Sequence, residues 1–510
     1  MVKSNGRPPV YSRLVIVLFL VLGAWCAPSS AQQSLEGRVK EYRLDNGMKI
    51  LALRRSGSPT FSAYIRFLVG GVDENMGQSG VAHILEHMLF KGSERIGTSD
   101  FKKEKAIMAR VEKLGAQFDA ERRKGSAADK AVIADLKEKL KKALDEQRTF
   151  VKEDEISEIY QRYGASGFNA FTAKDTTTYL IKLPVNKFEL WAWLESDRLR
   201  SPVLREYYSE RDVIMEERRR SIDTSPEGAL YERFMSAAFI AHPYGIPVIG
   251  WESDIDFMPL DYVKKFLKTY YSPNNMVICI VGDIDPDAVY HTIKKYFADI
   301  PPQQIPPRVA TIEPKQNGER RVEVEFDANP QVMIGFHRPT FPHKDMYVLD
   351  VMNTILGEGR TSRLHKSLVL EKALATEVGT FEAPGMRYDN LYAIQAVPRA
   401  PHTTKEVEDA IYEELDKMKT QPLSQKEMQK VINGMEAGFV RRLQSNSGIA
   451  HYLSEYQIVT GDWRFMTRYI DEIRKVTPDD VMEAAKKYLV KSNRTVATLA
   501  QVKKTDAVAK

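Results

Sequence analysis

Two histidines and a glutamate stand close together in a segment that the sequence predicts to be helical. His83–His87 has the sequence HILEH, within a helical stretch from Ser79 to Phe90. Histidines four residues apart lie on one face of a helix, about 6 Å from each other, as two ligands of a tetrahedral zinc ion require. Glu86 directly precedes the second histidine, so its carboxylate can reach a metal-activated water and act as a general base.

Such a string is uncommon in a chain with so few histidines. The protein has 9 histidines in 510 residues, and an HxxEH string arises by chance in roughly one such chain in a hundred. The alternative is that both histidines are ordinary surface or core residues. A third ligand further along the chain favours the metal site.

The third ligand is expected to be acidic and to lie on another helix. Glu206–Arg220 (EYYSERDVIMEERRR) has a helical pattern. In it Glu210 and Glu217 are seven residues apart and therefore share a face. Glu216 points about 100° away, where we expect it to be solvated or paired with the arginines that follow.

The elements that must position these residues occur twice in the chain. The segments Ile255–Asn275 and Ile473–Asn493 align without gaps, and each predicts an amphipathic helix, a Ser-Asn turn and an apolar strand. An earlier pairing aligns Val81–Leu89 with Val348–Leu356, at a wider separation along the chain. The first half therefore carries about fifty extra residues between these landmarks.

The extra residues form a recognisable insertion. Residues 101–158 are rich in charged side chains, contain no proline, and place apolar residues at heptad-like spacing on either side of Gly125-Ser126. We interpret this as a charged helical hairpin of about residues 101–152. It is either a solvated decoration or a contact for a partner or substrate.

These patterns predict an α+β protein of two homologous α/β sandwich domains with a helical-hairpin insertion in the first. The expected boundaries are 35–299 for the domain with HxxEH, 300–317 for a proline-rich linker, and 318–503 for the second domain.

The first thirty-one residues have the order of a secretory signal peptide. Lys3, Arg7 and Arg13 precede an apolar run from Leu14 to Ala27, and small residues follow. We expect cleavage after Ala31 and export to the periplasm, with no stable membrane span afterwards; an uncleaved anchor is the alternative. The net charge of +5 is too small for an electrostatic nucleic-acid binder.

These motifs together resemble one family. HILEH followed by ERDVIMEE is similar to the inverted zinc-peptidase signature of the pitrilysin/insulinase family, in the half-length branch of the β subunit of mitochondrial processing peptidase and its bacterial relatives. The resemblance extends over essentially the whole mature chain. Its further motifs are YRLDNG (Tyr42–Gly47), FNAFT (Phe168–Thr172), HPYG (His242–Gly245) and SRL (Ser362–Leu364).

The resemblance implies a zinc-dependent endopeptidase with one Zn²⁺ per chain. Zinc would be held by His83, His87 and Glu217, with Glu86 as catalytic base and Glu210 as a carboxylate that orients a ligand. The family spacing from the second histidine to the glutamate ligand is about 75 residues. The stretch from His87 to Glu217 is longer than this by roughly fifty residues, and the insertion accounts for the excess.

The resemblance also implies how a substrate is held. In the family, the strand corresponding to Asn169, Ala170, Phe171 and Thr172 is a sheet edge to which an extended peptide adds as another strand. We expect an extended run from Asn169 through Leu180; an ordinary core strand is the alternative.

Two further groups of positions, both in the second half, depart from the family. The Arg and Tyr that clamp a substrate in the second half correspond here to Val369 and Thr376. The counterparts of the HxxEH residues are Asp350, Asn353 and Thr354, so we expect no second zinc site. A heterodimer with a homologous subunit that carries Arg and Tyr but lacks HxxEH would complete the site, with a homodimer as the runner-up. The alternative function is a non-catalytic scaffold or chaperone-like subunit.

Overall fold

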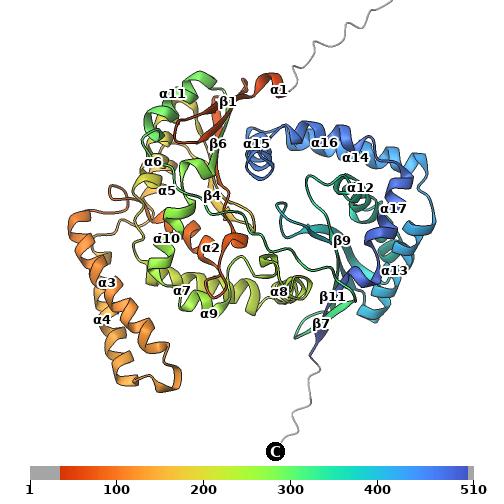
Figure 1. Ribbon diagram of the computed structural model, residues 1–510, viewed down its shortest axis with the longest axis horizontal. Coiled ribbons are helices and arrows are strands. Elements are labelled where there is room, and N and C mark those ends of the chain that lie inside the picture. The colour runs from red at the N-terminus through yellow and green to blue at the C-terminus, as the bar shows by residue number, and fades with distance from the viewer. Residues whose placement is uncertain (1–34, 503–510) are drawn as a thin grey trace, which may run out of the picture. The chain divides into compact units, whose positions relative to one another are not determined.

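A computed structural model describes residues 35–502 of the chain (Figure 1). The predicted signal peptide lies outside these residues. The contacts group Val39 and the described residues after it into one compact unit. None of the helices within residues 35–502 is long and apolar enough to cross a membrane.

The first half is built on a six-stranded mixed sheet with the order β1-β2-β6-β3-β5-β4. In it β2 and β6 are parallel, and β3 is antiparallel to both of its neighbours. The strands are β1 (Lys40–Arg43), β2 (Lys49–Arg54), β3 (Thr60–Phe67), β4 (Ser166–Thr172), β5 (Thr177–Pro184) and β6 (Met276–Gly282).

The second half repeats this arrangement in a five-stranded sheet with the order β7-β11-β8-β10-β9. Here too one pair, β7 and β11, is parallel, and β8 is antiparallel to both of its neighbours. The predicted duplication is therefore confirmed at the level of strand order and direction. The strands are β7 (Arg320–Phe326), β8 (Gln331–Arg338), β9 (Ala375–Ala383), β10 (Asn390–Pro398) and β11 (Arg494–Gln501).

The helices follow the same duplication. For example, α10 and α17 begin and end at positions that the alignment of Ile255–Asn275 with Ile473–Asn493 pairs with each other. The helices up to the linker are α1 (Leu35–Arg38), α2 (Val81–Met88), α3 (Phe101–Arg122), α4 (Lys130–Arg148), α5 (Glu155–Arg162), α6 (Phe188–Arg200), α7 (Tyr207–Arg218), α8 (Pro226–Ala238), α9 (Glu252–Asp256), α10 (Leu260–Tyr270) and α11 (Pro286–Phe297). Those after it are α12 (Asp345–Gly357), α13 (Thr404–Thr420), α14 (Gln425–Arg442), α15 (Asn446–Thr460), α16 (Phe465–Ile473) and α17 (Pro478–Tyr488).

Each half contributes one helix to the sheet of the other half. α15 packs on β3 and β6 of the first sheet, and α8 packs on β11 and β7 of the second. Phe234 of α8 is fully buried in a cluster that includes Leu391 and Leu499 of the second sheet. The two halves are therefore joined by exchanged apolar surface as well as by the linker, which has no helix or strand between α11 and β7.

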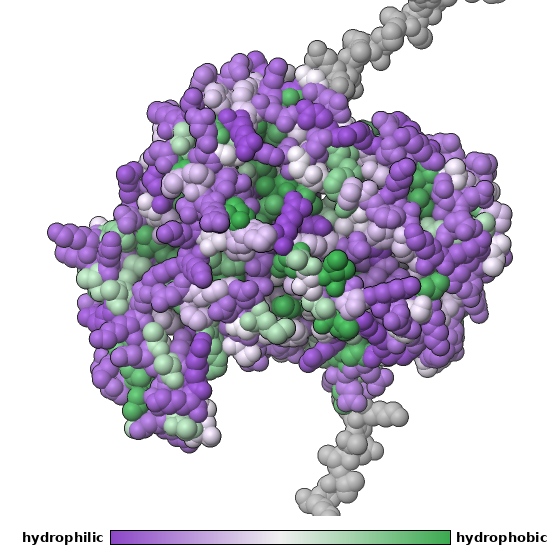
Figure 2. All heavy atoms as spheres, in the orientation of Figure 1, coloured by the Kyte–Doolittle hydropathy of each residue, from purple (hydrophilic) through white to green (hydrophobic). Residues whose placement is uncertain are grey.

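The insertion forms the expected helical hairpin, which confirms that interpretation. α3 and α4 pack against each other and project from the first half (Figure 1). Asp129 accepts hydrogen bonds from the backbone N–H groups of Ala131 and Val132 and so caps α4. The visible surface of the hairpin is mainly hydrophilic, with a few apolar residues (Figure 2). Ile107 and Leu140 nevertheless belong to the core of the first half.

Candidate metal centre

α2 carries both histidines and is anchored at its N-terminus by a buried carboxylate. Glu74 accepts hydrogen bonds from the backbone N–H groups of Gly80 and Ala82, both at 2.8 Å. These groups have no partner within the helix, and a carboxylate there also interacts favourably with the helix dipole. Gly80 has a φ of 93°, and a Cβ there would lie 2.4 Å from the carbonyl oxygen of Ile249. The start of α2 is thus held in one place.

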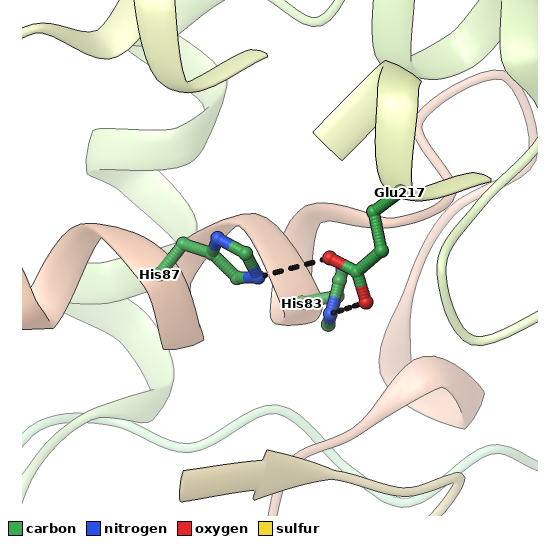
Figure 3. Close-up of side chains that lie close together, drawn as sticks. All are labelled: His83, His87 and Glu217. Carbon is green, nitrogen blue, oxygen red and sulfur yellow. Dashed lines mark ion pairs between the residues drawn. The ribbon is translucent and has the colours of Figure 1, made fainter. Parts of the chain in front are cut away.

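α7 brings the third predicted ligand to the two histidines (Figure 3). Glu217 Oε2 lies 3.3 Å from His87 Nε2, and Glu217 Oε1 lies 3.6 Å from His83 Nε2. One ligand atom of each residue lies within 4.8 Å of the others, and this is the one such group of His, Cys, Asp or Glu in residues 35–502 that could hold a metal ion. Two imidazoles and one carboxylate form the donor set of a catalytic zinc site, so these residues fit the metal.

Glu210 orients one of the histidines. Its Oε1 accepts a hydrogen bond of 2.8 Å from His87 Nδ1, which leaves Nε2 of that ring facing Glu217. Lys91 Nζ lies 2.6 Å from the other oxygen of Glu210. Burial raises the pKa of Glu210, but its hydrogen bonds with His87 and Lys91 outweigh this and lower the pKa to about 2. Glu210 therefore stays ionised while it holds the ring.

The two histidines lie in different electrostatic surroundings. Burial lowers the pKa of His83 to about 4, which keeps its imidazole neutral and able to act as a ligand. Burial has the same effect on His87, but hydrogen bonds with Glu210 and Glu217 outweigh it and raise its pKa to about 9. The carboxylates that favour a proton on His87 also favour a bound cation there.

Glu86 projects toward the edge strand of the sheet. Its Oε2 accepts a hydrogen bond of 2.6 Å from the hydroxyl of Thr172, at the end of β4. Burial raises the pKa of Glu86, and this hydrogen bond opposes the rise. A raised pKa suits a carboxylate that must take up and release a proton near neutral pH.

β4 is the edge strand of the first sheet and contains all four predicted substrate-binding residues. The expected extended run from Asn169 through Leu180 is wrong, however. Residues 173–176 form a turn, and β4 and β5 are the two antiparallel strands of a hairpin. The turn lets β5 pair with β3 on its inner side and leaves the outer edge of β4 without a strand partner in the described part of the chain. Phe168 and Ala170 face away from the side on which Phe171 contacts His451.

An ionic chain that the sequence analysis missed connects the insertion to the metal-binding group. Lys91 lies between Glu210 and Glu206, at 2.6 Å and 3.9 Å, and Glu206 is also 3.4 Å from Arg148 at the end of α4. Lys91 follows HxxEH by only four residues. Its position one helical turn beyond His87 was a signal that could have identified it.

The insertion also supports α7 directly. Gly115 of α3 lies so close to Tyr208 that a Cβ there would be 2.0 Å from its ring. Arg211 of α7 forms a bidentate ion pair with Asp119 of α3, at 2.7 and 3.0 Å. One face of the hairpin therefore packs on the helix that carries Glu217. Glu216 points outward and pairs with Arg219, away from the histidines.

A cavity of about 480 Å³ adjoins the metal-binding group. Its lining includes Glu86, His87 and Asn169, together with Arg148 and Lys152 at the end of the insertion. The insertion thus forms part of the wall beside the predicted base.

The second half has no comparable group in the described residues. Val369 lies in a short π-helical turn, and Thr376 is exposed on β9. The counterparts of His83 and His87, Asp350 and Thr354, lie on α12. When the alignment of Ile255 with Ile473 is extended back along the chain, the counterpart of Glu217 is Met435 on α14, which can supply no carboxylate.

Comparison with protein families and solved structures agrees with this geometry. Residues 50–151 match the model of insulinase (peptidase family M16), and residues 258–435 match the model of the peptidase M16 inactive domain. The chain belongs to the insulinase (M16) peptidase family. The first match contains His83, Glu86 and His87, and Glu217 lies between the two matches.

The relatives of this M16 chain include proteins named as zinc proteases and a processing-peptidase subunit. The zinc protease PqqE of Helicobacter pylori is 27% identical over 490 residues, covering 95% of this chain and 96% of that protein. The mitochondrial-processing peptidase subunit beta of Lentinula edodes is 21% identical over 465 residues, covering 88% and 86%. The crystal structure of a protease from Helicobacter pylori has a TM-score of 0.76 and 27% identity, covering 91% of this chain and 99% of that one.

Proposed function

We propose that this M16 chain is a zinc-dependent endopeptidase subunit that cleaves extended or unfolded peptides. The observation that carries the proposal is the meeting of His83, His87 and Glu217 from two helices, with Glu86 beside them. The names of its relatives support the same reaction class. A protein that only stored a metal would have no use for Glu86 next to the ligands.

The residues of the metal-binding group and its neighbours have separate roles in the proposed reaction. His83, His87 and Glu217 would hold one zinc ion, which when bound polarises a peptide carbonyl and acidifies a water molecule. Glu86 takes a proton from the attacking water at a carboxylate oxygen and delivers it to the departing amine nitrogen. Glu210 keeps the ring of His87 in the orientation that presents Nε2.

Substrate selection follows from the open edge of β4. A peptide in extended conformation can pair its backbone with β4, along Asn169, Ala170, Phe171 and Thr172. Because the hydroxyl of Thr172 donates a hydrogen bond to Glu86, such pairing brings a peptide bond next to that carboxylate. Only an unpaired strand can add to an edge, so folded proteins are poor substrates.

The test is hydrolysis of a quenched, unstructured peptide by the mature chain, assayed alone and mixed with a homologous subunit. We expect chelator to abolish cleavage and zinc to restore it. Glu86→Gln should lower kcat by about 10²- to 10⁴-fold while zinc stays bound, because a general base contributes about that much. Full activity in Glu86→Gln would overturn the assignment of the base.

We further propose that the active form is a heterodimer with a homologous subunit that carries the clamping Arg and Tyr; Val369 and Thr376 stand at those positions here. Cleavage should then appear only when the chain is mixed with such a homologue. Cleavage by the chain alone would favour a homodimer. No cleavage in any mixture, with zinc bound, would favour a non-catalytic scaffold subunit, to which the match with the inactive-domain model also points.

Export is the last part of the proposal. The signal-peptide pattern of the first thirty-one residues supports removal of that segment after Ala31 and release into the periplasm. The N-terminal sequence of the protein purified from a periplasmic fraction tests this. A chain that still begins at Met1 and sediments with membranes would indicate an uncleaved anchor.

A further inference from the structure

The second half contains a cavity of about 600 Å³ at the place that corresponds to the metal-binding group of the first half. Asp350, Asn353 and Thr354 of α12 line it, together with Met435 of α14. These are the four counterparts of the ligands and the base. The place that corresponds to the metal-binding group is therefore an open space and not a tightly packed core.

Two carboxylates and one guanidinium lie at one side of this cavity. Asp350 Oδ1 accepts a hydrogen bond of 2.7 Å from Arg338 Nη2, and Glu382 Oε1 lies 2.5 Å from Arg338 Nη1. The side chain of Arg338 is only 1% exposed, whereas that of Glu382 is 37% exposed and lines the cavity. With both carboxylates ionised, the group has one negative charge more than it has positive charges.

Aromatic rings form another part of the lining. Tyr452 and Tyr456 of α15 stack with a centroid separation of 6.3 Å, and Tyr456 lies 5.3 Å from Phe465. Tyr469 of α16 donates a hydrogen bond of 2.7 Å to Asp350 and so links the rings to the carboxylates. The guanidinium of Arg442 at the rim already lies 5.9 Å from the centroid of Tyr452. The same attraction between a ring face and a cation can act at the other rings of the lining, such as Tyr456 and Phe465.

An unsatisfied polar atom lies beside these groups. Oδ1 of Asn353 is buried and has no hydrogen-bond partner among residues 35–502. A buried amide oxygen without a partner costs free energy, so a ligand that donates an N–H to it would be favoured. The cavity thus offers an unpaired acceptor, two carboxylates that share one guanidinium, and aromatic faces, which together suit an organic cation.

We propose that this cavity binds the basic side chain of a peptide, the guanidinium of an arginine or the ammonium of a lysine. Both groups donate several hydrogen bonds and carry one positive charge, and their alkyl stems can lie against the rings. A divalent metal ion fits less well, because Arg338 already stands between Asp350 and Glu382. A preference for basic peptides as substrates rests on the proposed peptidase function, whereas binding itself does not.

The charge state of Glu382 makes binding depend on pH. Although 37% of its side chain is exposed to the cavity, desolvation by the surrounding protein and, next, repulsion by Asp350 raise the pKa of Glu382 to about 8, and Arg338 opposes the rise. Burial likewise raises the pKa of Tyr469, which therefore stays protonated. The other charged side chains that line the cavity are Glu358, Arg441 and Arg442. A bound cation favours the ionised form of Glu382, so affinity for an arginine ligand should rise between about pH 6 and about pH 9.

Calorimetric titration of the full chain with Nα-acetyl-argininamide and Nα-acetyl-lysinamide tests the proposal, with Nα-acetyl-norleucinamide as the uncharged comparison. We expect saturable binding of the two cations, and binding of the norleucine compound at least about tenfold weaker, because it lacks the charged donor. Equal affinity for all three compounds, or no saturable binding of either cation, would overturn the proposal.

Matched variants locate the site. At about pH 9, where Glu382 is ionised, Glu382→Gln should weaken binding of the arginine compound about tenfold. Glu377→Gln, on the same strand but exposed and outside the cavity lining, should leave it unchanged. Tyr456→Leu removes a ring while keeping an apolar side chain, and should weaken binding even if Glu382→Gln folds poorly. Unchanged affinity in both cavity variants, or displacement of the ligand by Ca²⁺ or Mg²⁺, would contradict the assignment. Zinc content and cleavage of an uncharged peptide, measured in parallel, report separately on the proposed function.

Discussion

The metal-binding group of the first half and the cavity of the second half occupy corresponding places in two copies of one fold. In each half, the helix that follows a central strand (β3 in the first half, β8 in the second) faces a helix from a later segment of the chain. In the first half these helices are α2 and α7, and their facing side chains meet within 4.8 Å. In the second half they are α12 and α14, which leave about 600 Å³ between them and their neighbours.

The difference teaches how little of the fold depends on the metal ligands. Strand order, strand direction and helix positions are retained where histidine is replaced by Asp350 or Thr354 and glutamate by Met435. The apolar faces of strands and helices therefore determine the scaffold, and the chemistry is added by a few side chains on it. The first half also has the insertion, which packs on α7, and the second half has no counterpart of it in the described residues.

The largest effect is expected from the ligand on α7. Glu217→Gln should abolish stoichiometric zinc binding and lower peptide cleavage about a thousandfold or more, because a neutral amide is a poor replacement for a carboxylate ligand. Glu216→Gln is the matched control, since Glu216 is exposed and pairs only with Arg219 among the described residues. Zinc per chain is measured by mass spectrometry. Equal zinc contents in the two variants would contradict the assignment of Glu217 as a ligand, and with it this difference between the two halves.

A smaller effect is expected from Lys91. Lys91→Met should lower kcat or zinc affinity about 10- to 100-fold, because it removes the cation that holds Glu210 against His87. Lys152→Met is the control, because Lys152 lines the same cavity but pairs with Glu155. Lys91→Arg should retain more activity than the Met variant. If Lys91→Met leaves both kcat and zinc affinity unchanged, as Lys152→Met should, the ionic chain has no role in catalysis.

Two glycine-to-alanine substitutions compare α7, against which the insertion packs, with α14, which borders the cavity of the second half. Gly115→Ala should lower the free energy of unfolding by about 1–3 kcal/mol, because its Cβ would overlap the ring of Tyr208 on α7. Gly434→Ala on α14 meets open space and should raise it by about 0.5–1 kcal/mol, since alanine is the better helix former. Urea denaturation measures both. Changes of the same sign would mean that the hairpin does not pack on α7 as described.

The smallest effect concerns pH. The pKa of Glu382 is raised from its ordinary 4.5 to about 8 in the folded protein. The native state therefore holds a proton that the unfolded chain has released between these values. The stabilisation is full below about pH 4.5 and is lost as pH rises through about 8. The difference in free energy of unfolding between the wild type and Glu382→Gln should decline over this window and level off above it; a constant difference would contradict the shift.

Much of the site could be predicted because it depends on local periodicity. The HILEH spacing indicates one helix face, and the Glu210–Glu217 spacing indicates another, without knowledge of the rest of the chain. The outward direction of Glu216 followed from the same rule. Lys91 was missed because its importance depends on a partner that is distant in the sequence. The turn after Thr172 was missed because two adjoining strands of similar composition read as one run.

The sequence by itself determined the duplicated architecture, the helices that carry HILEH and Glu217, the helical insertion and the set of residues able to bind zinc, because these follow from hydrophobic periodicity, repeat offsets and residue chemistry. Only the tertiary structure decided which elements meet. The hairpin packs on α7, and α8 and α15 each pack on the sheet of the other half. The counterparts of the metal ligands line a cavity with a charged group at its side. Contacts between distant segments depend on packing in three dimensions, and one-dimensional periodicity contains no information on which faces will pair.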